Sequence, residues 1–209
     1  VDDGNDLEQK AIIKSTVKEF ENAVLLLHAT NLGKGAAIAD GIAYLKEHHY
    51  SHAIQIDADM QHNLNDLNKF ISLSEQYPKD IISGAPLYDD KAPKGRVIGR
   101  KITNFFVALE CCTLSIKDAM IGFRVYPVEP IFKILKKHHV AMRMGFDIEI
   151  LVWAYWNGCK TRFIETKVTY PEGGISNFKA KDNLKISLMH TKLCTIALLK
   201  PILKVFNYV

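Results

Sequence analysis

The chain has 209 residues, 48% of them hydrophobic and 24% charged, so it is long enough to bury the core of one ordinary domain and too apolar to be disordered. Its net charge of +4 is mild, and no basic stripe is interleaved with aromatic residues, which argues against nucleic acid as a partner. The four cysteines form no CxxC pair, and reduced thiols in a cytoplasmic setting are the simplest interpretation.

Helical and extended patterns alternate through the first half of the chain. Apolar spacing predicts helices over residues 6–21, 33–47 and 65–77, and short apolar runs predict strands at 24–27, 53–56 and 81–82. Strands that alternate with helices of this length are typical of an α/β fold with a mainly parallel sheet. Because the first residues read as the end of a strand and the turn after it, we expect an amino-terminal segment with the first strand to be missing.

The second half of the chain is less regular. A polar loop is expected at 87–95, strands are expected at 123–126 and 161–170, and helices are expected over 97–113, after Pro127 and around 146–150. Residues 1–182 then form one α/β domain, and residues 183–209 form a carboxyl-terminal amphipathic helical tail.

The tail is apolar but carries lysines along its length. Its uncharged stretches are shorter than the ~18 apolar residues that a membrane-spanning helix needs. Two interpretations are equally open. Residues 184–209 form a helix that lies on a bilayer and gives peripheral membrane contact, or the helix packs on the core of its own domain.

The most informative segment is Ile54–His62. Its apolar run stops at two carboxylates, Asp57 and Asp59, spaced i, i+2. Carboxylates at the carboxyl end of a buried strand lie where open α/β sheets bind ligands. Hard oxygen donors suit Mg²⁺ or Mn²⁺, which take substrate phosphates as further ligands. The expected ligand is therefore a metal-bound diphosphate, most simply a nucleotide-sugar, and the alternative is a solvated loop that carries the pattern by chance.

A glycine-rich turn precedes the helix predicted at 33–47. Asn31-Leu-Gly-Lys-Gly35 lacks the upstream glycine and the Ser or Thr of a P-loop, which excludes that motif. The backbone N–H groups of such a turn, together with Lys34, still suit a phosphate. The alternative is a tight turn with a solvated lysine.

Two further carboxylates, Asp147 and Glu149, stand i, i+2 on an otherwise apolar segment, where charge is costly unless it is paired or used. Either suits a general base, because a sugar hydroxyl is a poor nucleophile until a carboxylate takes its proton. A phosphate acceptor would need no base. The alternative is a helix cap or a pairing with Arg143. Glycine-hinged turns at 122–124 and 173–176 flank this region, and each alone is more often structural.

These segments, in this order, resemble the family 2 glycosyltransferases with the Rossmann-like GT-A fold. Val1-Asp-Asp-Gly-Asn-Asp6 resembles the family's nucleotide-contacting Asp-Asp-Gly-Ser turn, and Asp57-Ala-Asp-Met-Gln-His62 resembles the version found in the dolichyl-phosphate mannose synthase branch. Asp118–Arg124 is similar to the family's loop near the acceptor, and Glu165–Phe178 to the stretch that closes over the site. The resemblance covers nearly the whole chain.

The resemblance implies roles for particular residues. It implies nucleotide-sugar contacts for Asp2, Asp3, Asn31, Lys34 and Asp57. It implies metal ligands at Asp57, Asp59 and Gln61. It implies acceptor contacts for Arg100, Gly122, Phe123, Arg124 and Ser176, with Glu149 or Asp147 as the acceptor-side acid. The polyprenyl-phosphate branch also carries an arginine in the loop after the strand at 81–84, and Gly84-Ala-Pro-Leu-Tyr88 has none.

We therefore predict an inverting glycosyltransferase that depends on Mg²⁺ or Mn²⁺ and moves a sugar from a UDP- or GDP-linked donor to a lipid-linked or saccharide hydroxyl. The alternatives are a polyprenyl-phosphate glycosyl synthase and a non-catalytic module that binds nucleotide-sugar or lipid. The expected location is cytoplasmic, at the cytoplasmic face of the membrane, in cell-envelope assembly.

Overall fold

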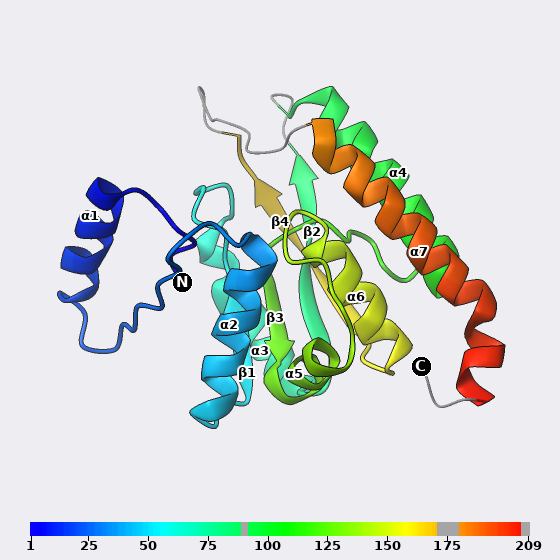
Figure 1. Ribbon diagram of the computed structural model, residues 1–209, viewed down its shortest axis with the longest axis horizontal. Helices are drawn as coiled ribbons and strands as arrows, with labels where there is room; N and C mark the ends of the chain where they lie inside the picture. Colours follow the sequence, from blue (N-terminus) through cyan, green and yellow to red (C-terminus); the bar gives the residue numbers. More distant parts are fainter. Residues whose placement is uncertain (89–91, 171–179, 206–209) are drawn as a thin grey trace.

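The computed structural model describes residues 1–88, 92–170 and 180–205. Within them a four-stranded sheet has the order β1-β3-β2-β4 (Figure 1). The strands are β1 His52–Gln55, β2 Ile81–Tyr88, β3 Arg124–Pro127 and β4 Thr161–Val168. β3 is antiparallel to β1 and β2, whereas β2 and β4 are parallel, so β1, β2 and β4 share one direction. The predicted α/β class is confirmed, and the sheet is mixed because β3 enters between β1 and β2.

Helices cover both faces of the sheet. They are α1 Leu7–Val17, α2 Lys34–Glu47, α3 Leu67–Gln76, α4 Lys94–Cys111, α5 Val128–Lys137, α6 Phe146–Trp156 and α7 Ala180–Val205, with a 3-10 turn at Leu64–Asp66. One core cluster joins the sheet to α2, α5 and α6, and a second joins the other face to α3. α4 and α7 run side by side outside α6 (Figure 1). Since α6 has the sheet on one side and this pair on the other, it is buried from Phe146 to Ala154.

Three predicted elements differ from the structure. The helix expected over 6–21 is the shorter α1, which projects from the body (Figure 1) and buries none of its described residues. The strand expected at 24–27 is a single bridge between Asp2 and Leu27. The strand expected at 81–82 continues to Tyr88, because β2 pairs with β4 along its whole length. Pro86 is tolerated there since, in the described residues, β3 pairs with β2 only at Ile82 and Ser83.

The tail packs on its own domain in the part of α7 that lies against α4. Met189, His190 and Leu193 are buried there, as the second of the two interpretations expects. Leu184 and Leu188 on the same helix stay exposed. In the described parts of the chain no helix is both long and apolar enough to cross a bilayer. The expected domain boundary at residues 182 and 183 falls within the first turn of α7.

Candidate functional site

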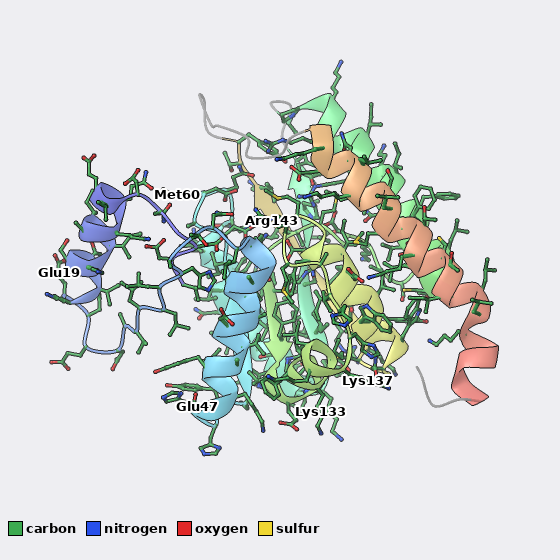
Figure 2. The ribbon with its side chains drawn as sticks, in the orientation of Figure 1. Glu19, Glu47, Met60, Lys133, Lys137 and Arg143 are labelled. Atoms are coloured by element: carbon green, nitrogen blue, oxygen red, sulfur yellow. The ribbon has the colours of Figure 1, made fainter. Side chains whose placement is uncertain are left out.

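The carboxyl end of β1 and the amino-terminal ends of α2 and α6 meet at one edge of the sheet. Lys34, the first residue of α2, places its ammonium 2.8 Å from Asp57 Oδ2 and 2.7 Å from Asp147 Oδ2. Figure 2 shows Met60, in the loop after β1, and Arg143, just before α6, at this same end of the molecule. Residues that three separate motifs supplied thus form one cluster, which we call the Lys34 cluster: Lys34, Asp57 and Asp147.

The charges of the Lys34 cluster stabilise one another. Burial opposes the charge on Lys34, but the carboxylates of Asp147 and Asp57 outweigh this effect and raise its pKa. Burial would likewise raise the pKa of Asp57, but contacts with His62 and Lys34 reverse the effect and hold that pKa well below its usual value. His62 Nε2 lies 3.7 Å from Asp57 Oδ2. The site therefore presents a fixed cation beside a fixed carboxylate near neutral pH.

A network of buried hydrogen bonds fixes the position of Asp147. Gln55 donates to Asp147 Oδ1 at 3.0 Å and accepts a hydrogen bond from the Tyr126 hydroxyl at 3.0 Å. Burial raises the pKa of Tyr126 to about 12, which keeps its hydroxyl a donor. Arg124 is fully buried and donates to the backbone carbonyl of Asp147 at 2.6 Å and to Ser83 Oγ at 3.3 Å. We expected Arg124 to contact the acceptor. In the structure it is buried against the first turn of α6, where its hydrogen bond to the backbone orients Asp147.

The turn before β3 fits closely against Asp57. A Cβ atom on Gly122 would lie 2.2 Å from Asp57 Oδ2, so a glycine is required for this approach. Phe123 is buried, and its ring stacks on that of Phe70 with centroids 4.1 Å apart. It also lies 5.4 Å from the His62 ring. Two of the residues expected at the acceptor therefore support Asp57 and the loop that follows it.

The loop after Asp57 carries the other expected metal ligands. Asp59 is exposed, and its Oδ1 accepts the backbone N–H of Gln61 at 3.1 Å. The described residues contain no group of three or more His, Cys, Asp or Glu side chains that could hold a metal. A divalent cation held here would therefore take carboxylate oxygens from Asp57 and Asp59 and draw further ligands from a phosphate substrate. That donor set fits Mg²⁺ or Mn²⁺, which bind through one or two carboxylates.

The amino-terminal turn is tied to the glycine-rich turn through Asp3. Its carboxylate accepts the backbone N–H groups of Leu32 and Gly33 at 2.8 Å each and contacts His28 Nδ1 at 2.8 Å. Burial alone would raise the pKa of Asp3, but these hydrogen bonds lower it. Asn31 Nδ2 donates to the backbone carbonyl of Asp3 at 3.1 Å. The two turns expected to contact the nucleotide therefore form one surface.

Contacts of two more side chains, those of Asp2 and Arg143, shape this surface. Asp2 is buried, and its Oδ1 accepts the backbone N–H of Asn5 at 3.0 Å. Arg143 donates to Asn31 Oδ1 at 3.0 Å and to the Asn31 carbonyl at 3.1 Å. The sequence indicated Arg143 only as a partner for the carboxylates of α6, because nothing in a linear pattern joins residues 112 positions apart.

Asp147 and Glu149 face different parts of the protein. Residues spaced i, i+2 on a helix point about 200° apart, so only Asp147 reaches the Lys34 cluster. Glu149 is 1% exposed and forms an ion pair with Lys192 of α7. It also accepts the backbone N–H of Ala141 at 2.8 Å and the indole N–H of Trp153 at 3.3 Å. Its carboxylate therefore joins α6, α7 and the loop before α6.

Arg100, also expected to contact the acceptor, pairs with Asp118 rather than with the Lys34 cluster. Arg100 Nη1 donates to both carboxylate oxygens of Asp118, at 2.8 and 2.9 Å, and its guanidinium lies 5.7 Å from the centre of the Tyr88 ring. The charge of Arg100 is thus matched within the protein. Ser176 lies outside the described residues.

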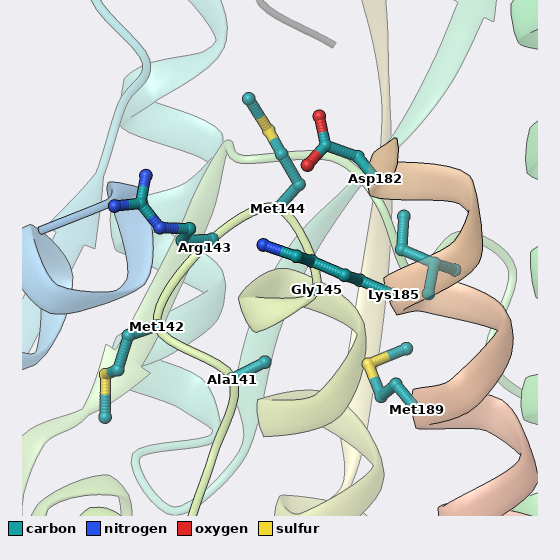
Figure 3. Close-up of a pocket in the computed structure, with 9 residues that line it drawn as sticks. Ala141, Met142, Arg143, Met144, Gly145, Asp182, Lys185 and Met189 are labelled. Atoms are coloured by element: carbon teal, nitrogen blue, oxygen red, sulfur yellow. The ribbon is translucent and has the colours of Figure 1, made fainter. Parts of the chain in front are cut away.

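A cavity of about 220 Å³ opens between the 141–145 loop and the first turns of α7 (Figure 3). Arg143 and Lys185 supply its cations, and Met144 and Met189 are among its apolar lining. Because Arg143 also holds Asn31, the cavity adjoins the surface formed by the two amino-terminal turns. No motif in the sequence indicated it.

Comparison with known families identifies the class of protein. The family model described as glycosyl transferase family 2 matches residues 1–135, and the chain belongs to this family. The family resemblance expected from the motifs is confirmed.

Two curated relatives match most of this chain. Dolichyl-phosphate beta-glucosyltransferase ALG5A of Trichomonas vaginalis is 30% identical over 208 residues, which cover 91% of this chain and 61% of that protein. The uncharacterized protein MJ1222 of Methanocaldococcus jannaschii is 26% identical over 181 residues, which cover 84% of this chain and 71% of that protein. The chain thus spans 61% of the length of the first of these curated relatives.

Solved structures of similar shape confirm the GT-A fold. Glucosyl-3-phosphoglycerate synthase from Mycobacterium tuberculosis, in complex with UDP, matches with a TM-score of 0.57 and 14% identity over 91% of this chain and 65% of that one. The same enzyme with Mn²⁺, UDP and glucosyl-3-phosphoglycerate matches with a TM-score of 0.55 and 16% identity over 94% of this chain and 64% of that one. At these identities the likeness establishes the fold alone.

Proposed function

We propose that the chain binds a nucleotide-diphosphate sugar at the Lys34 cluster and transfers the sugar, with inversion, to an acceptor. The observation that carries this proposal is the contact of Lys34 with both Asp57 and Asp147. It brings a cation and a carboxylate together at the carboxyl end of β1, which is where α/β sheets bind their ligands. Membership of family 2 supports the same activity.

The donor nucleotide, UDP or GDP, lies along the surface formed by Asp2, Asp3 and Asn31. Two observations support this placement. Asp3 and Arg143 both hold Asn31, so the surface is built before a ligand arrives. The synthase from M. tuberculosis, which shares the fold, was solved with UDP. The ammonium of Lys34, held by Asp57 and Asp147, then lies beside the diphosphate.

The cofactor is Mg²⁺ or Mn²⁺, held by Asp57, Asp59 and Gln61. When bound, such an ion neutralises charge on the departing diphosphate. The exposed carboxylate of Asp59, two residues after Asp57 in the loop at the carboxyl end of β1, supports this assignment. The synthase of the same fold was also solved with Mn²⁺ and UDP together.

The acceptor is either a hydroxyl, on a lipid-linked or saccharide substrate, or a phosphate. For a hydroxyl, Asp147 rather than Glu149 takes the proton, because its carboxylate lies in the Lys34 cluster. The second candidate is a polyprenyl-phosphate glycosyl synthase, which needs no base. It is favoured by the 30% identical relative named as a dolichyl-phosphate beta-glucosyltransferase.

A lipid acceptor would also give α7 a role at the cytoplasmic face of a membrane. Leu184, Leu188 and Leu198 are 64%, 61% and 82% exposed. Lysines on the same helix suit anionic headgroups, so we expect peripheral contact through residues 184–209. Sedimentation with anionic and with neutral vesicles tests this contact. Replacing Leu184 and Leu188 with Ser should release the chain from the anionic vesicles.

Calorimetric titration of UDP and of GDP, each with and without Mn²⁺, tests the donor site. We expect one diphosphate to bind, and to bind more tightly with Mn²⁺. Product assays with a radiolabelled UDP- or GDP-sugar then separate the acceptors. Asp147→Asn removes an ion pair of the donor site and should lower transfer to either acceptor, but it should lower transfer to a hydroxyl on the order of 10²-fold or more beyond its effect on transfer to a phosphate. Binding without transfer to any acceptor would favour the non-catalytic module.

A further inference from the structure

Glu149 is a buried carboxylate that lies close to the candidate site in sequence and faces away from it in space. It is 1% exposed and forms an ion pair with Lys192 of α7. Glu149 accepts the backbone N–H of Ala141 at 2.8 Å, and Lys192 donates to the backbone carbonyl of His139 at 3.3 Å. The pair therefore holds the backbone at the start of the 141–145 loop and just before it.

The 141–145 loop has little other support from α7. A cavity of about 220 Å³ lies between this loop and the first turns of α7 (Figure 3). Atoms that line a cavity have no partner on the empty side and gain no packing energy there. On the side of α7 the position of the loop therefore depends on Glu149 and Lys192.

The opposite side of the loop fits closely against the first turn of α2. Ala36 donates its backbone N–H to the carbonyl of Met142 at 3.2 Å. A Cβ atom on Gly35 would lie 2.8 Å from the carbonyl oxygen of Ala141, and one on Gly33 would overlap the carbonyl oxygen of Met142. Glycine at both positions lets the two backbones approach this closely. A shift of the loop is therefore passed on to the start of α2.

The start of α2 carries the cation of the candidate donor site. Lys34 is the first residue of α2 and the centre of the Lys34 cluster. The loop also reaches the neighbouring turn, because Arg143 donates to Asn31. Contacts thus run without a break from the pair of Glu149 and Lys192, through the loop, to the Lys34 cluster.

We propose that Glu149 is a positioning residue for the donor site and that Lys192 of α7 holds its carboxylate in place. The carboxylate faces α7 and the loop rather than the Lys34 cluster. It fixes the 141–145 loop, and the loop fixes the turns that place Lys34 and Asn31 beside the diphosphate. The effect on donor binding rests on the proposed transferase function, whereas the positioning of the loop can be measured without a ligand.

Amide hydrogen exchange of the whole unliganded chain tests the positioning role. Glu149→Leu removes the acceptor of the Ala141 N–H, so exchange over residues 31–37 should become about tenfold faster or more relative to α3. Glu149→Gln keeps an acceptor oxygen and should retain most of the protection. Val107→Ala is the control for lost stability, since Val107 is fully buried in α4 and outside this series of contacts. It should leave exchange over 31–37 unchanged relative to α3.

A second variant reaches the same contact from α7. Lys192 is 44% exposed, so Lys192→Met introduces no buried polar group of its own and should fold even if Glu149→Leu does not. It releases the carboxylate of Glu149 from its ion pair. Exchange over 31–37 should therefore also become faster relative to α3.

Calorimetric titration of UDP and of GDP with Mn²⁺ measures the consequence for the donor site. The Kd of the diphosphate should be about tenfold weaker in Glu149→Leu and within about twofold of the wild type in Glu149→Gln and Val107→Ala. In turnover assays the KM for the donor should rise while kcat at saturating donor changes little. That split is expected when a variant weakens the binding of the ground state and the transition state alike.

The outcomes separate the explanations. Equal exchange over 31–37 in Glu149→Leu and Val107→Ala, relative to α3, would overturn the positioning role. Faster exchange with an unchanged diphosphate Kd would overturn the link to the donor site. A wild-type chain that bound neither UDP nor GDP would remove the proposed function, and the exchange measurements would still decide whether Glu149 positions the loop and the start of α2.

Discussion

Replacing Gly122 with alanine should displace Asp57 without unfolding the protein. The added Cβ would lie 2.2 Å from Asp57 Oδ2, 2.4 Å from Oδ1 and 2.5 Å from Cγ. Ordinary carbon contacts are ~3.5 Å or more, so the carboxylate must retreat by roughly 1 Å. The atoms it meets are the end of a side chain that can rotate, which is why the backbone around β3 should keep its conformation.

The size of the effect follows from the contact that is lost. A retreat of this size stretches the 2.8 Å hydrogen bond between Lys34 Nζ and Asp57 Oδ2 beyond bonding distance. The two side chains are 28% and 26% exposed, so the pair is partly screened by water. We expect a loss of about 1–2 kcal/mol in donor binding, which corresponds to a Kd roughly tenfold weaker.

Calorimetric titration of the diphosphate with Mn²⁺ measures this change, and Gly99→Ala is its control. Gly99 lies within α4 with nothing within 4 Å of an added Cβ, so this variant should keep the donor Kd and gain up to ~1 kcal/mol of helix stability. If Gly122→Ala bound the diphosphate as the wild type does, Asp57 would not be part of the donor site.

Three further predictions concern other residues of the site. Asp59→Ala should remove the Mn²⁺-dependent part of diphosphate binding while the unfolding free energy changes by less than ~0.5 kcal/mol, since Asp59 is exposed; Mn²⁺ dependence that survives would refute the metal assignment. Lys192→Met should lower the free energy of unfolding measured in urea by about 2–3 kcal/mol, because it leaves the buried charge of Glu149 uncompensated, although Lys192 itself is 44% exposed. A loss of unfolding free energy smaller than that of Glu149→Gln would contradict this. The hydrogen bond to Asp3 raises the pKa of His28 above 6.5. The protonated His28 ring therefore contributes fully to the free energy of unfolding below pH 6.5, and this contribution is lost as the pH rises through the raised pKa. Urea unfolding across neutral and alkaline pH should show this loss in the wild type and not in His28→Asn.

The helices and most strands could be predicted because each follows from local periodicity. α2 and α3 begin and end within a few residues of the expected bounds, since apolar spacing and the flanking turns are local signals. The position of β3 between β1 and β2 could not be predicted, because strand order depends on contacts between distant segments. The length of β2 was also missed. Gly84 and Pro86 usually end a strand, and only full pairing with β4 explains why they do not.

The site could be predicted as a set of residues but not as an arrangement. Lys34, Asp57 and Asp147 each belonged to a motif, and only the fold brings them within hydrogen-bond distance. The supporting residues Gln55 and Tyr126 carried a weaker signal. Both are polar side chains at buried positions of strands, and a buried polar group needs a partner. That requirement points to a network but does not name its members.

The two carboxylate pairs of this chain have the same spacing and different consequences because their backbones differ. Asp57 and Asp59 follow the end of β1 in a loop, where both can face one ligand. Asp147 and Glu149 lie on α6, where side chains two residues apart point about 200° apart. One therefore contacts Lys34, and the other contacts Lys192 of α7. A base at Glu149 would require α7 to give up that ion pair, whereas a base at Asp147 requires no movement of the helix. For a hydroxyl acceptor, Asp147→Asn should therefore lower the rate of transfer far more than Glu149→Gln.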